Sequence, residues 1–312
     1  MAARLLSRRP RRRAPKRAGP AAEVRADGDE PGAAPEREVL AVCAGGGTGY
    51  DIGSLAVASA RSWAAGGREV LLVDADASGS GLAKRLSKAT HKAFSPSERG
   101  MPSLIAARRG IEADSLREHC WTLEVGGGSL WALFAPTHPS GARRSARWLA
   151  DHAGELAALR AHRWVVVSLP GLPDEIHVEL LERASVTAIA SQVSDASQLM
   201  ALRQAADKYA AGGWQRSNAR LIIEGQAGIS DAIIDAETGI AVVGRLGQVR
   251  DSALLGGRAR LGDRRVLAAI DKIAAGLTEP PAETVLSSPR LGRPPAPPSR
   301  SLRRKKRGHD AA

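Results

Sequence analysis

Apolar residues along this chain gather in short, continuous runs. The clearest runs lie at residues 38–44, 69–74, 164–167 and 219–224, and Val, Leu, Ile or Ala dominate each of them. A strand that is apolar at nearly every position is covered on both faces, whereas a half-exposed strand alternates apolar and polar residues. The pattern therefore predicts the central strands of a sheet that is buried on both sides.

Longer segments with helical spacing of apolar residues separate these runs. Helices are predicted at residues 54–65, 142–160, 174–183, 195–211, 229–235 and 264–275, and further strands at 121–125, 130–135, 186–190 and 240–244. Three glycines at 126–128 suggest a turn between two of these strands. Alternating strands and helices predict a single doubly wound, mainly parallel α/β sheet with helices on both faces.

The composition changes sharply at both ends of the chain. Residues 1–37 are rich in Arg, Ala and Pro, and residues 279–312 are rich in Pro and end in a basic run at 303–307. Segments with so few bulky apolar residues cannot bury enough surface to offset the entropy of ordering. We therefore expect a disordered basic tail over 1–37, a folded domain over 38–278 and a disordered Pro-rich basic tail over 279–312.

The positive charge is concentrated in these tails. The chain has a formal net charge of +12, and its first 17 residues contain eight Lys or Arg and no acid. Basic tails suit weak contact with an anionic membrane or with nucleic acid, although such tails often serve only solubility. No apolar run approaches the roughly 20 residues of a membrane span, and two cysteines are too few for a disulfide scaffold. These features predict a cytoplasmic protein, peripheral at the membrane if a tail binds lipid.

A glycine-rich loop follows the first apolar run. Gly45, Gly46, Gly47, Thr48 and Gly49 lie between the first predicted strand and the first predicted helix. In a parallel sheet this arrangement points loop amides and a helix N-terminus at one place, which favours a phosphate group. The loop is therefore the leading candidate for a binding site, although glycines also serve ordinary tight turns.

Residues 39–277 resemble the MinD/ParA group of P-loop ATPases, which begin with a strand and a loop of the form K-G-G-x-G-K-T-T. Gly46, Gly47 and Gly49 match the three glycines of that loop. The run Gly256-Gly257-Arg258 is similar to a segment of the CpaE-like branch. These are actinobacterial, septum-site-determining relatives that are encoded near secretion or Tad pilus genes. The resemblance implies the P-loop fold, ATP as ligand, Mg²⁺ bound with the nucleotide, and a homodimer.

The resemblance also assigns roles to two aspartates. The segment Leu71 to Asp76 matches a family strand that ends in D-x-D. This match makes Asp76 the acid nearest the metal or the attacking water, hence the candidate catalytic residue, and Asp74 its neighbour. Without the resemblance, both would be interpreted as ordinary polar residues at a strand end.

Three groups that the family uses for catalysis are substituted. Without gaps, the signature lysine falls on Gly45, the phosphate-binding lysine on Tyr50 and the Mg²⁺-binding hydroxyl on Asp51. The aspartate after the strand at 164–167 is replaced by Ser168, and a neutral hydroxyl is a poor substitute for a carboxylate near Mg²⁺. An alternative alignment with a two-residue insertion makes Ser54 the hydroxyl residue. The candidate nucleotide-binding residues are Gly45, Gly46, Gly47, Thr48, Gly49, Tyr50, Asp51, Ser54, Asp74 and Ser168, and no separate metal ligands are predicted.

Three hypotheses follow. The first is a scaffold with a degenerate ATP site that helps to position or regulate secretion, pilus or division machinery through protein partners. The second is a divergent but active ATP-binding switch of the chromosome-partitioning or septum-site class. The third is a partition factor that binds nucleic acid through its basic tails. Losing the lysine, the hydroxyl and the aspartate together affects both charge neutralisation and metal binding, so the first hypothesis leads and hydrolysis is not expected.

Overall fold

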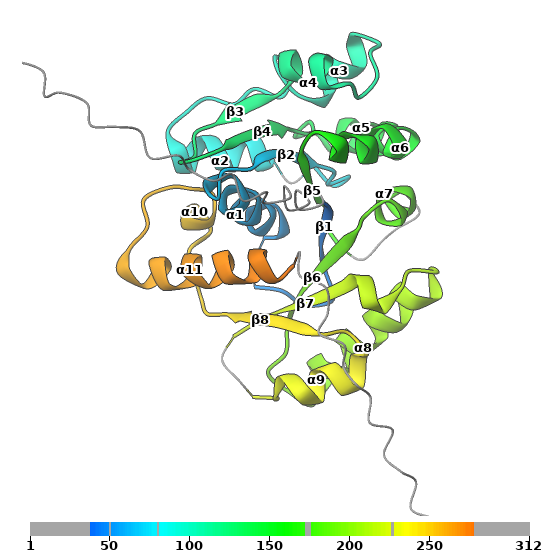
Figure 1. Cartoon of the computed structure of the whole chain (residues 1–312), viewed down its shortest axis with the longest axis vertical. Helices are drawn as coiled ribbons and strands as arrows, with labels where there is room; N and C mark the ends of the chain where they lie inside the picture. Colours follow the sequence, from blue (N-terminus) through cyan, green and yellow to red (C-terminus); the bar gives the residue numbers. More distant parts are fainter. Residues whose placement is uncertain (1–37, 50, 80, 172–175, 226–227, 278–312) are drawn as a thin grey trace, which may run out of the picture. The chain divides into compact units, whose positions relative to one another are not determined.

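The continuous apolar runs form one eight-stranded sheet in the computed structural model, which describes residues 38–49, 51–79, 81–171, 176–225 and 228–277 (Figure 1). All of these residues belong to one unit of the chain, Arg37–Ala312. Tyr50 and the two predicted tails lie outside the described residues.

The sheet is parallel except at one edge. The strands are β1 (Val39–Ala44), β2 (Glu69–Asp74), β3 (Trp121–Leu123), β4 (Ser129–Leu133), β5 (Trp164–Ser168), β6 (Val186–Gln192), β7 (Ala219–Glu224) and β8 (Val242–Leu246). Their order is β3-β4-β2-β5-β1-β6-β7-β8, and only β3 and β4 pair antiparallel. The predicted doubly wound, mainly parallel α/β sheet is therefore confirmed.

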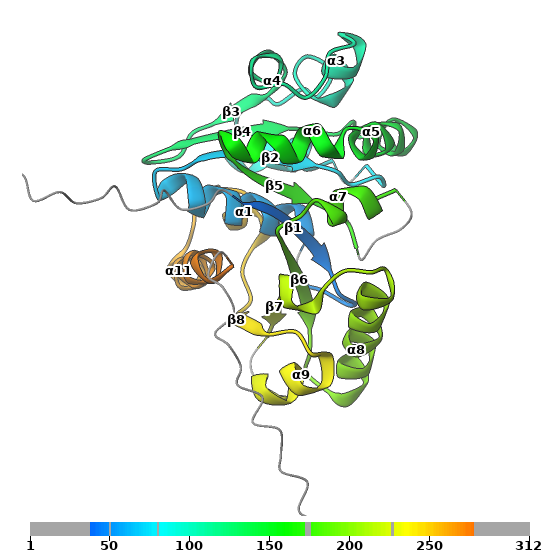
Figure 2. The same ribbon diagram turned by 45° about the vertical axis from the view of Figure 1, so that its right-hand side comes forward.

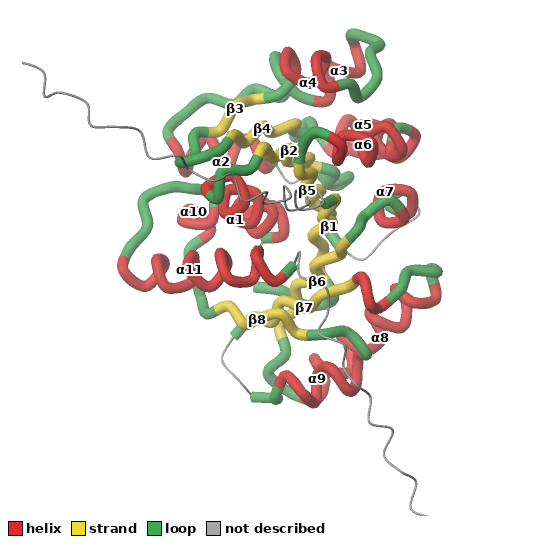
Figure 3. The backbone as a smooth tube through the Cα atoms, in the orientation of Figure 1, coloured by secondary structure: helices red, strands yellow, loops and turns green. Residues whose placement is uncertain are grey.

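Helices cover both faces of this sheet (Figures 2 and 3). One core includes apolar residues from α1 (Ile52–Ala65), α2 (Leu82–Thr90), α10 (Asp251–Leu254) and α11 (Leu261–Gly276). The other includes residues from α3 (Met101–Ala106), α4 (Ala113–His119), α5 (Pro139–Asp151), α6 (Ala153–Ala158), α7 (Val178–Glu182), α8 (Ala196–Ala211) and α9 (Asp231–Thr238). The helices thus form two layers that enclose the sheet.

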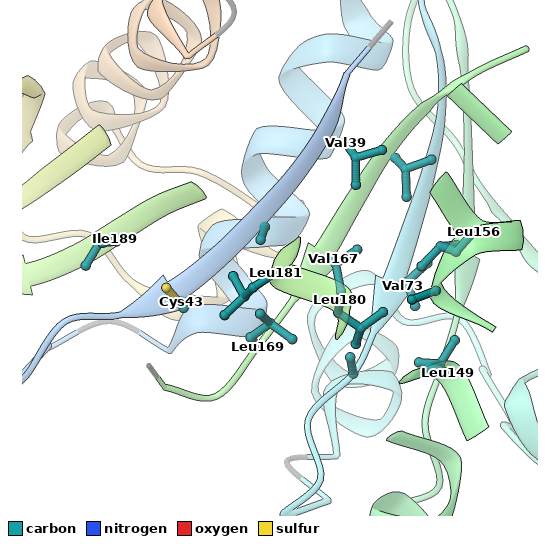
Figure 4. Packing of buried hydrophobic residues seen from close by; sticks show 14 of the residues in the cluster. Val39, Cys43, Val73, Leu149, Leu156, Val167, Leu169, Leu180, Leu181 and Ile189 are labelled. Carbon is teal, nitrogen blue, oxygen red and sulfur yellow. The ribbon is translucent and has the colours of Figure 1, made fainter. Parts of the chain in front are cut away.

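The two cores explain why the strands do not alternate. In β1, Val39, Ala41 and Cys43 point into one core, part of which is drawn in Figure 4. Leu40 and Val42 point into the other core. Since successive side chains of a strand face opposite sides, a strand between two apolar layers needs apolar residues at every position.

Several predicted helix and strand limits were wrong. The helix predicted at 142–160 is two helices that meet at His152, whose φ of −109° leaves the helical range. The strand predicted at 240–244 lies at Val242–Leu246 instead. The helix predicted at 174–183 covers only Val178–Glu182 among the described residues. Helices α2, α3, α4 and α10 were not predicted, and each of them has fewer than ten residues.

The parallel strands end at a common edge of the sheet, and this edge carries the candidate site. Asp74 at the end of β2 lies opposite Ser168 at the end of β5. Gln192 at the end of β6 lies opposite Glu224 at the end of β7. The glycine loop leaves the end of β1 between these pairs, because β1 lies between β5 and β6. No helix in the described part of the chain is both long enough and apolar enough to cross a membrane.

Candidate functional site

The first half of the glycine loop is fixed to strand β6. The Gly45 N–H donates to the Ala190 carbonyl oxygen at 2.8 Å, and the Gln192 N–H donates to the Gly47 carbonyl oxygen at 2.8 Å. A Cβ atom at Gly45 would lie 2.4 Å from the Ile189 Cγ2 atom, so a side chain fits there only if the buried Ile189 side chain shifts. The position that carries the signature lysine in the family is therefore closed by packing in this chain.

The second half of the loop leads into α1 through an aspartate cap. Asp51 precedes the first helical residue, Ile52, and its Oδ2 atom accepts a hydrogen bond from the Ser54 N–H at 2.7 Å. This carboxylate therefore occupies the helix N-terminus, where the unpaired amides favour an anion. Ser54 lies in the first helical turn with no exposed surface, and its hydroxyl is 3.4 Å from the Arg85 Nη1 atom.

Arg85 is the cation that lies beside this cap. It comes from α2, and its Nη1 atom lies 2.6 Å from Asp51 Oδ2 and 3.6 Å from Asp251 Oδ2. Its Nε and Nη2 atoms are buried and have no hydrogen-bond partner among the described residues. The site therefore does contain a guanidinium, but two acidic side chains of the chain itself neutralise it.

A second carboxylate contacts the loop from the end of β7. Glu224 is 6% exposed, its Oε1 atom accepts a hydrogen bond from the Thr48 hydroxyl, and its Oε2 atom accepts one from the Gly49 N–H. An anionic side chain therefore already binds a loop amide and a loop hydroxyl. These are the donors that a phosphate group would need.

The two candidate aspartates lie where the D-x-D pattern predicts, after β2. Asp74 is 2% exposed and accepts a 3.4 Å hydrogen bond from the Asp76 N–H. Burial, and secondly the charge of Asp76, raise the pKa of Asp74 to about 7. Asp76 Oδ1 accepts hydrogen bonds from the Ser78 N–H at 2.8 Å and the Ser78 hydroxyl at 2.6 Å. Ser168 is also buried, so the pair opposite each other on β2 and β5 has one carboxyl group rather than two.

Carboxylates lie where a P-loop would hold the phosphates of its magnesium nucleotide. Glu224 and Asp51 place two carboxylates on the loop and on the start of the helix, where the polyphosphate would lie. No group of three or more His, Cys, Asp or Glu side chains that could hold a metal ion occurs in the part of the chain that the structure describes. A polyphosphate beside the loop would meet these two carboxylates, and the nearby Arg85 guanidinium is already paired with Asp51 and Asp251.

The cysteines and the neighbouring histidine do not form a second reactive site. Cys43 and Cys120 are both buried and unpaired, and burial raises the pKa of each thiol to about 12. The His119 Nδ1 atom lies 2.9 Å from the Ser103 hydroxyl oxygen, so this histidine has a polar partner of its own. Both thiols remain protonated at neutral pH and serve as small apolar core residues.

Four residues of the site were missed by sequence reasoning. Glu224 and Arg85 contact the loop and its cap, Asp251 pairs with Arg85, and His177 Nε2 lies 3.0 Å from the Ala75 carbonyl oxygen. A carboxylate directly after a buried strand was an available signal for Glu224. No comparable signal marked Arg85, because its helix was not predicted.

Comparison with known proteins identifies the fold. No family model matches the chain, and no curated protein matches it. Among solved structures, a ParA family ATPase from Chlorobium tepidum matches with a TM-score of 0.58 and 16% identity, over 77% of this chain and 99% of that chain. MinD from Pyrococcus horikoshii, solved with Mg-ADP, matches with a TM-score of 0.57 and 12% identity, over 78% of this chain and 99% of that chain. MinD in a MinC:MinD cell division complex from Aquifex aeolicus matches with a TM-score of 0.55 and 15% identity, over 77% of this chain and 95% of that chain.

This chain therefore has the fold of the MinD/ParA P-loop ATPases. At these identities the likeness shows the fold, and the chemistry has to be argued from the residues of the site.

Proposed function

We propose that this protein is a MinD/ParA-type scaffold that acts by contact with protein partners and does not hydrolyse ATP. One observation carries the proposal, namely that the Glu224 carboxylate binds the Gly49 N–H and the Thr48 hydroxyl. The Glu224 carboxylate then takes the place of the phosphate group that such a loop binds.

Electrostatics makes this replacement effective. Two unit charges 4 Å apart interact with about 4 kcal/mol at an effective dielectric constant near 20. A phosphate oxygen next to the loop would face repulsion of that order from Glu224. Arg85 offsets little of it, because Asp51 and Asp251 already neutralise the guanidinium.

A fold of this kind without the catalytic groups suits binding of a protein partner rather than ATP hydrolysis. One structural neighbour is a MinC:MinD cell division complex, and another is a plasmid partition protein from Borrelia burgdorferi. By analogy, the partner of this chain belongs to a septum, partition, secretion or Tad pilus machine, and the CpaE-like resemblance favours the last two. We place this role in the cytoplasm, with the basic tails available for weak contact with lipid or nucleic acid and with a homodimer as the working form.

An ATP hydrolysis assay tests this proposal. The purified chain should release phosphate from ATP at the same background rate with and without Mg²⁺, and the Asp76→Ala variant should show that same rate. Turnover that needs Mg²⁺ and is lost in the Asp76→Ala variant would overturn the proposal.

A specific observation keeps an active switch as the second candidate. Asp74 and Asp76 lie together at the carboxyl end of β2, where they could hold Mg²⁺ beside a nucleotide. This candidate predicts dimerisation that responds to ATP, measurable by light scattering. If the molecular mass stays the same with and without ATP and Mg²⁺, the active switch is excluded.

A further inference from the structure

A polar cavity lies along α1, away from the glycine loop. Ten residues of helix separate Asp51 from Arg61, which corresponds to about 15 Å. The cavity has a volume of about 310 Å³ and is formed where α1, the end of α2, the end of β3 and the connection between α10 and α11 meet. The side chains that give it its chemistry are Arg61, His91, Lys92, Thr122, Glu124 and Arg258.

The Gly256-Gly257 pair builds one wall of this cavity. Gly256 has a φ of +86°, and a Cβ atom there would lie 2.6 Å from the Arg61 Cζ atom. A Cβ atom at Gly257 would lie 2.7 Å from the carbonyl oxygens of Ala89 and Ser252. Both positions therefore need glycine, and the close approach that glycine permits brings Arg258 to the same cavity as Arg61.

The cavity has an excess of positive charge. Arg61, Lys92 and Arg258 are cations, and among the described residues that line the cavity Glu124 is the one carboxylate. Glu124 is paired with Lys92, with 2.6 Å between Oε1 and Nζ. No acidic partner of Arg61 or Arg258 occurs among the described residues, and burial alone lowers the pKa of Arg61. A half-buried guanidinium without a counter-ion is costly, and a bound anion would remove that cost.

We propose that this cavity binds a phosphate group, carried by a small soluble diphosphate or by a lipid headgroup. Two guanidinium groups and an ammonium group present several charge-assisted donors, which suits the oxygens of a phosphate. The volume is at the lower end of the range of ligand cavities and is large enough for a diphosphate or a headgroup. The site extends beyond the proposed scaffold role and does not depend on whether the glycine loop binds ATP.

Calorimetric titration of the full chain with inorganic pyrophosphate at constant ionic strength tests the site. The wild-type chain should bind about one pyrophosphate at this cavity, and the Arg61→Gln and Arg258→Gln variants should each lose at least tenfold in affinity. Arg265→Gln removes one exposed arginine from α11 and is the matched control, with wild-type affinity expected. Any binding by the basic tails is the same in all four proteins. Equal affinity in all four would overturn the proposal.

Two further arms complete this test. Vesicles of phosphatidylcholine with phosphatidic acid show whether the cavity takes a lipid headgroup, with pure phosphatidylcholine as the blank. If the chain binds phosphatidic acid but not pyrophosphate, and Arg258→Gln weakens that binding, the site is supported and its ligand is a lipid headgroup. If the chain binds neither probe, the proposal is contradicted. Because Arg61 packs on Gly256, the folding of the Arg61→Gln variant is checked by urea denaturation. If that variant is unfolded, the affinity of the Arg258→Gln variant, at a more accessible position, is the result that tests the site.

Discussion

The guanidinium of Arg85 lies 2.6 Å from the carboxylate of Asp51, at the residue where the glycine loop becomes helix α1. The same Asp51 oxygen accepts a hydrogen bond from the Ser54 N–H. One carboxylate thus caps the helix and neutralises an arginine from the next helix of the chain. In a nucleotide-binding loop the phosphates lie in this neighbourhood, and in this chain the ion pair of Asp51 and Arg85 lies there.

The cap can be separated from the ion pair by two substitutions at one position. Asp51→Ala removes both, and a loss of about 1–2 kcal/mol in the free energy of unfolding is expected. Asp51→Asn keeps a capping oxygen and removes only the charge, so its loss should stay below about 1 kcal/mol, as for other partly exposed ion pairs. Urea denaturation measures both values. Equal losses in the two variants would show that the cap does not contribute.

Asp74 predicts an unusual dependence of stability on pH. Its pKa is about 7 in the folded chain against an ordinary value of 3.8. Between these two pH values the folded state binds more protons than the unfolded state, so the contribution of Asp74 to stability falls as the pH rises from about 4 to 7. Asp74→Asn should therefore stabilise the chain at pH 8 by up to a few kcal/mol, and have little of this effect at pH 4.

The comparison with Asp151→Asn isolates this effect. Asp151 is exposed at the end of α5 and serves as the matched control. Stability curves of the wild type and both variants between pH 4 and 8 should differ only for Asp74→Asn. If that variant follows the wild-type curve at every pH, the buried carboxyl group does not have a raised pKa.

Two glycines should respond to alanine in opposite directions. A Cβ atom at Gly128 would lie 2.2 Å from the Arg68 carbonyl oxygen and 2.6 Å from the Ala64 carbonyl oxygen, and backbone atoms cannot easily move away. Gly128→Ala should cost about 1–3 kcal/mol or more. Gly154 lies in helix α6 with no atom within 4 Å of such a Cβ, so Gly154→Ala should gain about 0.5–1 kcal/mol. If Gly128→Ala leaves the free energy of unfolding unchanged, Gly128 is not packed closely against these carbonyl oxygens.

The sequence predicted the strands far better than the site. The limits predicted for Glu69–Asp74 and Ala219–Glu224 were confirmed, because continuous apolar runs are a local signal. Helices α3 and α4, of six and seven residues, gave no such signal. The contact between Glu224 and Gly49 spans 175 positions in the chain, so no local pattern could predict it. The loop predicted a phosphate site, and the structure places a carboxylate from a distant part of the chain against the same loop.

Calorimetric titration of the purified chain with ATP, with and without Mg²⁺, shows whether the Glu224 carboxylate keeps a nucleotide out of the glycine loop. The wild-type chain should show no Mg²⁺-dependent binding, and Glu224→Ala should gain measurable affinity, because the Gly49 N–H and the Thr48 hydroxyl lose their bound carboxylate. Glu182→Ala, an exposed acid at the end of α7, is the control and should behave as the wild type. If the wild-type chain binds ATP in a Mg²⁺-dependent way and Glu224→Ala leaves that affinity unchanged, Glu224 does not block nucleotide binding at the loop.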